Sequence, residues 1–548
     1  MATAAAPQDT SPTSDSPAAA SNESRESQPS DEEPPPTEEV EVEVYSLFNT
    51  PLHKLIIFTL LSLATLTSPL TATIYLPLLP LLSQHYAVSP QRINLTITIY
   101  IIFQALSPLL LSTPSDTLGR RPLFLLTFAI YTLASILLAI IRSNFAALLT
   151  LRALQSLGAS AVLSVVYGTV SDVYVPSERG KVLGPVMAAA NLGTAIGPLV
   201  GGWIALSSGS VWWVFWTLAI FGAFMLVSLG ALLPETARNV VGNGGIKDKA
   251  WNRPLLDLNR WSRSRTPACS TIRTTTDGGR STRSLKFRNP LMSIRIMAHP
   301  DTAIILWIVA TFYALWYIVQ ASIPSVYRQH PYNFNEFQTG LAYLTGAAGV
   351  IICMYATGKA MDYNYRVIAR RMNFPIDKVK GDDLSRFPIE KARGRGCTWL
   401  LLASLAVSVG YGWAIEKHAH VAVPLTLQLL MGFLATWILN CFNALLVDGF
   451  PQMPSTAATA GNMVRCGMSA GAVAALQPLT QAIGRGWVFT LAGILTGVGG
   501  LVGVVVLNHK GLDWRNRRNK SISTGEESKV ATSQEEHPQQ DLMDTEKR

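Results

Sequence analysis

The sequence predicts an all-α polytopic membrane protein with twelve transmembrane helices in two six-helix bundles. Three observations support this fold class. Hydrophobic residues make up 49% of the 548 residues and charged residues only 14%, whereas soluble domains carry roughly 25% charged residues. Many apolar runs reach the length of about 20 residues that crosses a bilayer. These runs fall into two equal groups on either side of a long polar stretch at residues 234–300.

The first 50 residues differ sharply from the rest of the chain. They contain eleven acidic residues, one basic residue (Arg25) and many Ser and Pro, with few large apolar side chains. Such a composition predicts a disordered acidic tail. The tail lacks the basic and apolar regions of a cleaved signal peptide, so we expect the first span to direct its own insertion.

Apolar runs without charged residues give the expected spans directly. They lie near residues 55–79, 93–112, 122–141, 145–170, 182–206, 211–233, 302–324, 338–358, 397–415, 421–446, 456–481 and 487–507. The chain therefore divides into a tail at 1–50, an N-terminal bundle at 51–233, a central loop at 234–300, a C-terminal bundle at 301–508 and a tail at 509–548.

The distribution of Lys and Arg between the spans predicts the orientation. The five loops that follow even-numbered spans hold 27 basic residues, and the six loops that follow odd-numbered spans hold five. Because positive loops stay in the cytoplasm, both termini and the central loop are expected there. The positive charge is thus explained by the cytoplasmic loops beside the membrane. It does not indicate nucleic-acid binding. A six-plus-six layout around a cytoplasmic loop is typical of transporters built from two parallel halves.

Residues that carry catalytic or metal chemistry form no recognisable set. The five cysteines are scattered singly, so the sequence predicts neither a metal site nor a disulfide framework. The eight histidines lie mostly in loops, and the glycines near residue 244 lack the Lys-Ser/Thr of a phosphate-binding loop. We therefore expect no enzyme activity and no cofactor.

A short segment between the second and third spans, residues 112–122, predicts a latch at the cytoplasmic end of the helices. Gly119 suits a tight turn. The Asp116 carboxylate can pair with Arg120 or with the positive N-terminal end of a neighbouring helix, and Arg121 follows. The alternative interpretation is an ordinary basic turn.

Two arginines lie inside expected spans, where a charge is costly and normally faces a cavity or a partner. Arg152 and Gln155 are three residues apart and so share a helical face in span 4, as do Asn462 and Arg465 in span 11. Snorkelling of the arginines to the headgroups is the alternative. Further candidates for substrate contact are Asn440 in span 10, Trp316 in span 7 and Tyr75 in span 1.

Span 5 carries glycines at four-residue spacing, which let helices approach closely, and a proline that bends the helix. The residues are Gly193, Gly197, Pro198, Gly201 and Gly202. A general small-residue packing face is the alternative. No Asp or Glu lies deep in any expected span, so two inward arginines favour an anionic or neutral, hydrogen-bonding substrate over a cation.

Several of these segments resemble the major facilitator superfamily. Residues 112–122 resemble its signature loop, with Ser112 and Thr117 where that pattern has Gly and Arg, and span 4 resembles its Arg-x-x-Gln pattern. Span 5 resembles the motif of antiporter-type exporters. The chain is most similar to the fungal twelve-span drug:proton antiporters, near the quinidine-resistance and citrate-exporter group, on residues 233–238, 361–366, 387–393 and 462–466.

The resemblance implies the major facilitator fold, a role for Arg152 in substrate contact or proton coupling, and export. The expected function is secondary active export of a small organic molecule, namely a metabolite, toxin, drug or organic acid, by proton antiport and alternating access. An importer or facilitated-diffusion carrier for an organic anion is the first alternative, and a membrane receptor or scaffold is the second. We expect a monomer surrounded by membrane lipid, in the plasma membrane, with the acceptor sequence at Asn94 too near the bilayer for glycosylation.

Overall fold

The computed structural model describes residues 51–174, 176–241, 296–372, 388–450 and 454–545. The predicted acidic tail at 1–50 and most of the predicted central loop, residues 242–295, lie outside the described residues. The described residues form helices and turns, without a strand among them.

The helices of the N-terminal part follow the expected spans closely. Seven α-helices and one 3₁₀ turn lie within residues 51–232, and a one-turn helix lies near the start of the predicted central loop. They are α1 (Pro51–Thr73), η1 (Leu76–Leu78), α2 (Leu79–His85), α3 (Pro90–Leu118), α4 (Arg120–Ile140), α5 (Phe145–Val173), α6 (Pro176–Ser208), α7 (Trp212–Leu232) and α8 (Arg238–Val241).

The helices after the central loop include the longest in the chain. They are α11 (Pro300–Tyr327), α12 (Glu336–Arg371), α13 (Ile389–Gly394), α14 (Cys397–Glu416), α15 (Ala422–Asp448) and α16 (Pro454–Thr545). In α16 the backbone leaves helical geometry at Gly484, where φ is 80°. Gly484 turns the chain between the predicted spans 456–481 and 487–507.

Eleven helices among the described residues are long and apolar enough to cross a membrane. The last of them, Thr456–Arg518, has 63 residues, far more than the roughly 20 that one crossing needs. Because it bends at Gly484, it accounts for the last two expected spans. The twelve-helix fold class is therefore confirmed.

Local sequence signals explain where several helices begin. The Asn335 side chain accepts a hydrogen bond from the backbone N–H of Gln338, and the Gln338 side chain accepts one from the backbone N–H of Asn335. This reciprocal pair is a capping box that satisfies otherwise unpaired donors. Asn144 caps α5 through two backbone N–H groups. Polar caps thus separate spans whose apolar composition alone would not define their ends.

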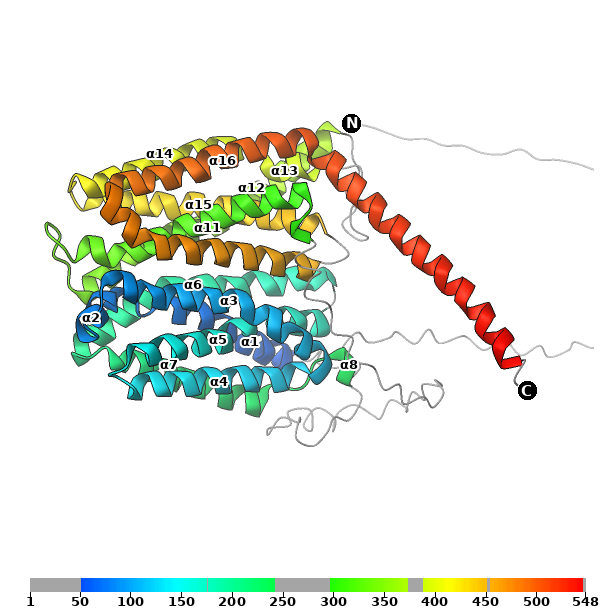
Figure 1. The fold of residues 1–548 in the computed structure, drawn as a ribbon, viewed down its shortest axis with the longest axis horizontal. Coiled ribbons are helices and arrows are strands. Elements are labelled where there is room, and N and C mark those ends of the chain that lie inside the picture. Colours follow the sequence, from blue (N-terminus) through cyan, green and yellow to red (C-terminus); the bar gives the residue numbers. More distant parts are fainter. Residues whose placement is uncertain (1–50, 175, 242–295, 373–387, 451–453, 546–548) are drawn as a thin grey trace, which may run out of the picture. The chain divides into compact units, whose positions relative to one another are not determined.

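The spans pack in two groups that match the order of the chain (Figure 1). Helices α1, α3, α4, α5, α6 and α7 contact one another, and α11, α12, α14, α15 and α16 do the same. The most extensive contacts between the groups are those of α6 with α12 and of α3 with α16, and η1 and α2 also contact the C-terminal group. The site described below lies where helices of both groups meet.

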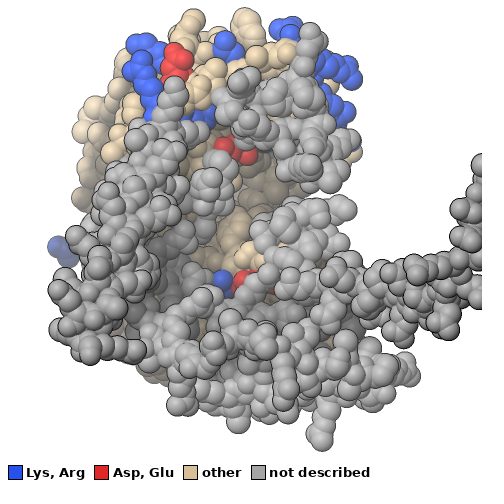
Figure 2. All heavy atoms as spheres, turned by 90° about the vertical axis from the view of Figure 1, so that its right-hand side faces the viewer, with Lys and Arg blue, Asp and Glu red and all other residues tan. Residues whose placement is uncertain are grey.

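The helix surfaces that face outward are strongly apolar. Trp203, Val227 and Trp399 are at least 59% exposed, and exposed side chains of this kind suit contact with lipid. Charged residues gather at the helix ends instead. Figure 2 shows Lys and Arg side chains along one edge of the end where α8 and α13 lie, with Asp and Glu among them.

Candidate functional site

Arg152 lies within α5, fully buried among residues of the N-terminal group. Its Nη1 donates to Oε1 of Gln155 at 2.7 Å and to the backbone oxygen of Thr71 on α1 at 3.4 Å. The guanidinium carbon lies 4.0 Å from the ring centre of Tyr75 and 4.5 Å from that of Tyr100. Two aromatic faces therefore enclose the cation, which favours a buried guanidinium electrostatically.

The residues around Arg152 are themselves held by hydrogen bonds to α4 and α1. Nε2 of Gln155 donates to the Ser135 hydroxyl on α4 at 2.8 Å, and the Tyr100 hydroxyl donates to the Ser68 carbonyl on α1 at 3.0 Å. With no exposed surface, Arg152 does not reach the membrane surface. The snorkelling alternative is wrong for this residue in the conformation described.

Arg465, on α16, has a different environment and remains partly exposed. Its Nε and Nη2 donate to Oδ1 of Asn462 at 3.2 and 2.9 Å. Nδ2 of Asn462 donates in turn to the Gln104 carbonyl on α3 at 3.3 Å. The guanidinium carbon lies 4.6 Å from the ring centre of Tyr313 on α11. Asn462 thus orients Arg465 and also joins the two helix groups.

Three residues near Arg465 were not predicted from the sequence. Tyr167 on α5 is 40% exposed and interacts electrostatically with Arg465. The side-chain Oε1 of Gln104 is buried without a hydrogen-bond partner among the described residues. The Tyr317 ring lies 4.9 Å from that of Tyr313. A single Tyr or Gln in an apolar span carries no signal of its own, because its role depends on a helix that is distant in sequence.

The remaining predicted contacts lie in different places. Tyr75 covers Arg152, as described. Trp316 packs against a glycine face, since a Cβ at Gly346 would lie 2.8 Å from its ring. Asn440 is half-buried on α15 and makes no hydrogen bond to a described residue. The structure therefore brings Asn462 together with Arg465 but brings neither Trp316 nor Asn440 into that cluster.

The glycine motif of span 5 packs α6 against two helices. A Cβ at Gly193 would lie 2.8 Å from the Leu66 carbonyl, and Cβ atoms at Gly197 and Gly201 would overlap Thr73 and Ile74. The first three glycines of the motif therefore face α1 and the turn that follows it. A Cβ at Gly202 would instead lie 2.5 Å from the Glu336 carbonyl of α12.

The partner helix α12 carries a matching small residue. A Cβ at Gly340 would lie 2.7 Å from the Pro198 carbonyl. Backbone therefore meets backbone between α6 and α12, which only small residues allow.

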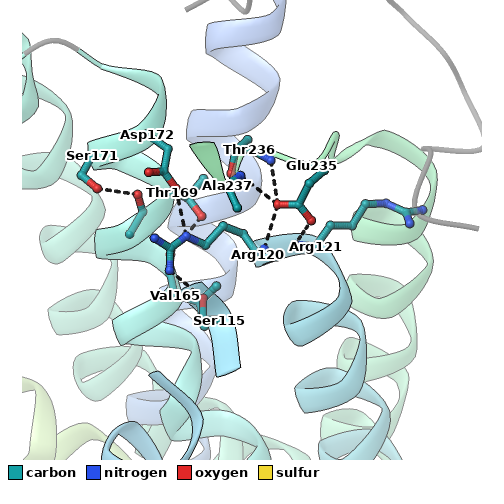
Figure 3. Close-up of polar contacts among 11 residues, drawn as sticks. Ser115, Arg120, Arg121, Val165, Thr169, Ser171, Asp172, Glu235, Thr236 and Ala237 are labelled. Carbon is teal, nitrogen blue, oxygen red and sulfur yellow. Dashed lines mark hydrogen bonds and ion pairs between the residues drawn. The ribbon is translucent and has the colours of Figure 1, made fainter. Parts of the chain in front are cut away.

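At the end of α3, Gly119 adopts φ 114° and leads into α4. Figure 3 shows that the Glu235 carboxylate accepts hydrogen bonds from the backbone N–H groups of Arg120 at 2.8 Å and Arg121 at 3.1 Å. A Cβ at Gly119 would overlap this carboxylate. Glu235 therefore caps α4, and its charge stabilises the positive N-terminal end of that helix.

The Arg120 side chain pairs with Asp172 at the end of α5. Its Nε donates to Oδ2 of Asp172 at 2.9 Å, and its Nη1 donates to the Ser115 hydroxyl at 2.8 Å (Figure 3). The Asp116 side chain lies outside the described residues, so its pairing with Arg120 stays a prediction. Asp172 and Glu235 were not assigned to the latch from the sequence.

The C-terminal group carries a buried ion-pair network that the sequence did not predict. Arg515 lies 3.3 Å from Glu390, and Arg518 pairs with Asp301 at the start of α11. Burial raises the pKa of Glu390 above its ordinary value, and the Arg515 cation partly offsets this rise. The network joins the segment after the last span to α11 and α13.

A metal or a cofactor finds no obvious ligands in the part of the chain that the structure describes. No group of three or more His, Cys, Asp or Glu side chains there is placed to hold a metal ion. The polar groups that gather inside the helices are instead guanidinium, amide and phenol groups. Such groups bind by hydrogen bonding and charge.

Comparison with known proteins adds independent information. Residues 61–475 match the family model for the Major Facilitator Superfamily. The chain is 33% identical to the MFS-type transporter phiD of Fungal sp. over 89% of this chain and 73% of that protein. It is 31% identical to the MFS-type transporter tstD of Talaromyces stipitatus over 93% and 90%, and 31% identical to Citrate exporter 1 of Aspergillus niger over 86% and 88%.

A solved structure has the same fold. The human organic anion transporter MFSD10 matches with a TM-score of 0.51 at 18% identity, over 82% of this chain and 99% of that one. The family model covers well over half of the chain, and the similar proteins are membrane transporters and not enzymes. The chain therefore belongs to the major facilitator superfamily and is an integral membrane transporter.

Proposed function

We propose that this transporter exports a small organic anion from the cytoplasm, and that Arg465 binds the anionic group. The observation that carries the proposal is the partly exposed guanidinium of Arg465, fixed by Asn462 near the middle of a span. A cation in this position is costly unless it has a function. Likeness to a citrate exporter at 31% identity supports an exported acid.

Arg152 has a separate role in this proposal. Its Nη1 donates to Gln155 and Thr71, and the rings of Tyr75 and Tyr100 lie against the guanidinium. Its Nε and Nη2 are buried without a hydrogen-bond partner among the described residues. It holds α1, α3 and α5 together and keeps the N-terminal group rigid while the two groups move. Substrate contact or proton coupling through Arg152 would require this cluster to open.

Alternating access would rock the two groups about the substrate site. The close contacts of Gly202 and Gly340 between α6 and α12 support a closed end on the side where α12 begins. The Arg120–Asp172 pair and the Glu235 cap lie at the opposite end and belong to one group. We propose that this latch keeps the N-terminal group intact as a rigid body, with both termini in the cytoplasm.

The direction and the coupling ion complete the proposal. The span-5 glycine motif supports export, because it is similar to that of antiporter-type members. Proton antiport in the plasma membrane, the secretion of metabolites or toxins and resistance to drugs are proposed on the same resemblance. We further propose that the protein works as a monomer with a small-molecule substrate and protons.

Flux through vesicles of known orientation tests the function. A panel of organic acids, neutral amphipathic drugs and cationic drugs is loaded, and efflux is followed with and without an imposed pH gradient. We expect acid flux that follows the gradient and disappears in Arg465→Gln at matched protein level. The matched control is Arg92→Gln, since Arg92 is exposed at the start of α3.

The alternatives predict other outcomes in the same vesicles. Acid flux that ignores the pH gradient would identify a facilitated-diffusion carrier. Flux in the opposite direction would identify an importer. Absence of flux for the whole panel would contradict the transport of organic acids and favour a receptor or scaffold.

A further inference from the structure

The charge available to a substrate is smaller than the two arginines suggest. Arg152 and Arg465 are the basic residues that lie near the middle of a described span. Arg152 has no exposed surface, so it presents no donor to an incoming molecule. The described contacts of Arg465 come from the Asn462 amide, aromatic rings and the Cys466 thiol and not from carboxylates. Neither arginine is paired with a described carboxylate, and only the guanidinium of Arg465 is exposed to an incoming molecule.

The guanidinium of Arg465 has one edge without a protein partner among the described residues. Its Nε and Nη2 donate along one side to Asn462, and one face lies against Tyr313. Nη1 makes no hydrogen bond to a described residue. A guanidinium has five N–H donors in a rigid fork, so the Nη1–Nη2 edge is left for a ligand. This edge matches the two oxygens of one carboxylate.

Tyrosine side chains from both helix groups lie near Arg465. Tyr313 and Tyr317 lie with ring centres 4.9 Å apart on α11. From the other helix group, Tyr167 presents a ring that is 40% exposed, and its hydroxyl donates to Sδ of Met187, a weak acceptor. The flat aromatic ring of a ligand packs well against such side chains. Apart from the buried Arg152, no other Lys or Arg among the described residues lies near the middle of a span.

A multiply charged acid would be a poor ligand here. With one carboxylate on Arg465, each further carboxylate would lie near the middle of the membrane without a counter-ion. An unpaired charge in such a place is strongly disfavoured. Neutral molecules would leave the free edge of Arg465 unpaired. Charge balance therefore favours a ligand with a single negative charge.

We infer that the Arg465 site selects monocarboxylates with an aromatic or conjugated body and discriminates against tricarboxylates such as citrate. This inference rests on the proposed function, since it assigns the substrate class of that same site. It separates this chain from the citrate exporter with which it shares 31% identity. Arg465 supplies the charge, Asn462 its orientation, and Tyr313 the preference for a flat body.

Binding to the purified full-length protein in nanodiscs tests the inference at pH 7.5. Isothermal titration calorimetry is performed with cinnamate, with 3-cyclohexylpropanoate of the same charge and a saturated ring, and with citrate. We expect cinnamate to bind at least tenfold more tightly than either of the others. Arg465→Gln should abolish this binding, and the control Arg92→Gln should retain it.

Two substitutions test the aromatic part. Tyr313→Leu should bind cinnamate and 3-cyclohexylpropanoate with equal affinity. Tyr313→Phe should still bind cinnamate more tightly. Thermal unfolding of each variant identifies any that fails to fold. If Tyr313→Leu keeps the full preference, the assignment of Tyr313 is wrong.

Other outcomes separate this inference from the proposed function. Citrate binding that equals or exceeds cinnamate binding and requires Arg465 would overturn the charge inference and leave the proposed exporter standing. Failure of the folded wild type to bind any of the three probes would also overturn the inference. Vesicle flux with the wider panel would then decide the proposed function independently.

Discussion

The two groups of helices each contain one arginine within a span, and they treat it in opposite ways. The N-terminal group encloses Arg152 between two tyrosine rings and leaves it no exposed surface. The C-terminal group leaves Arg465 partly exposed and uses Asn462 to orient it. Protein partners offset part of the cost of the buried cation at Arg152, although its Nε and Nη2 have no hydrogen-bond partner among the described residues. At Arg465 the proposed ligand would offset that cost. Burial therefore distinguishes the arginine for which we propose a structural role from the one that we propose binds substrate, although the two sequence motifs look alike.

Stability gives the largest expected contrast between the two arginines. Arg152→Leu should lower the free energy of unfolding by at least about 3 kcal/mol, because two desolvated cation–π contacts are lost and Gln155 loses its partner. Arg465→Leu should lower it by less than half as much. Thermal unfolding of the purified protein, followed by tryptophan fluorescence, measures both. Equal losses would erase the distinction between the two sites.

The two carboxylates that cap helices after a glycine provide a second contrast. Glu235 is buried and Glu416 is exposed. Both accept backbone N–H groups, those of Arg120, Arg121, Thr236 and Ala237 for Glu235 and those of Arg485 and Gly486 for Glu416. Removing a buried acceptor leaves its backbone N–H donors unpaired, and each unpaired buried group lowers stability by about 1–3 kcal/mol. Glu235→Ala should therefore lower stability by about 2–3 kcal/mol and Glu416→Ala by under about 1 kcal/mol.

The same unfolding measurement compares the two cap variants. Glu235→Gln serves as the matched control, because the amide oxygen can still accept hydrogen bonds. It should recover part of the loss. A larger effect at Glu416 than at Glu235 would contradict the importance given to burial.

Asn462 allows the binding arginine to be perturbed without removing it. Asn462→Ala removes both hydrogen bonds from Arg465 to Asn462. It should reduce substrate flux at least tenfold, since a hydrogen bond to a charged group is worth about 1.5–3 kcal/mol. Asn462→Asp should reduce flux further, because its carboxylate would compete with the anion for Arg465. Initial rates in vesicles measure the order. Flux in Asn462→Asp at or above that of Asn462→Ala would show that Arg465 does not bind an anion.

The smallest expected effect concerns pH and the ion-pair network of the C-terminal group. Because burial raises the pKa of Glu390, the folded protein binds a proton there more readily than the unfolded chain. Stability from this group should therefore rise as pH falls toward its ordinary value of 4.5. Relative to Glu390→Gln, the wild type should gain unfolding temperature between pH 7.5 and pH 5. A relative loss would mean that the Arg515 pairing outweighs the burial.

The sequence predicts the spans well because crossing a bilayer requires a long apolar helix. Such a helix can be recognised from the composition of one continuous stretch of sequence. The Arg152–Gln155 and Asn462–Arg465 pairs are likewise local, since residues three apart share a helical face. What encloses them is not local. Tyr100, Tyr313 and Asp172 come from helices that meet only in the folded protein. The difference in exposure between two similar arginine motifs therefore could not be predicted.

Chemical accessibility of the two guanidinium groups tests the central claim most directly. Phenylglyoxal, which modifies accessible arginines, would be applied to the folded protein in nanodiscs, and modified peptides would be quantified by mass spectrometry. We expect Arg465 to react, cinnamate to slow its modification, and Arg152 to stay unmodified until the protein unfolds. Modification of Arg152 in the folded protein at the rate of Arg465 would contradict the account.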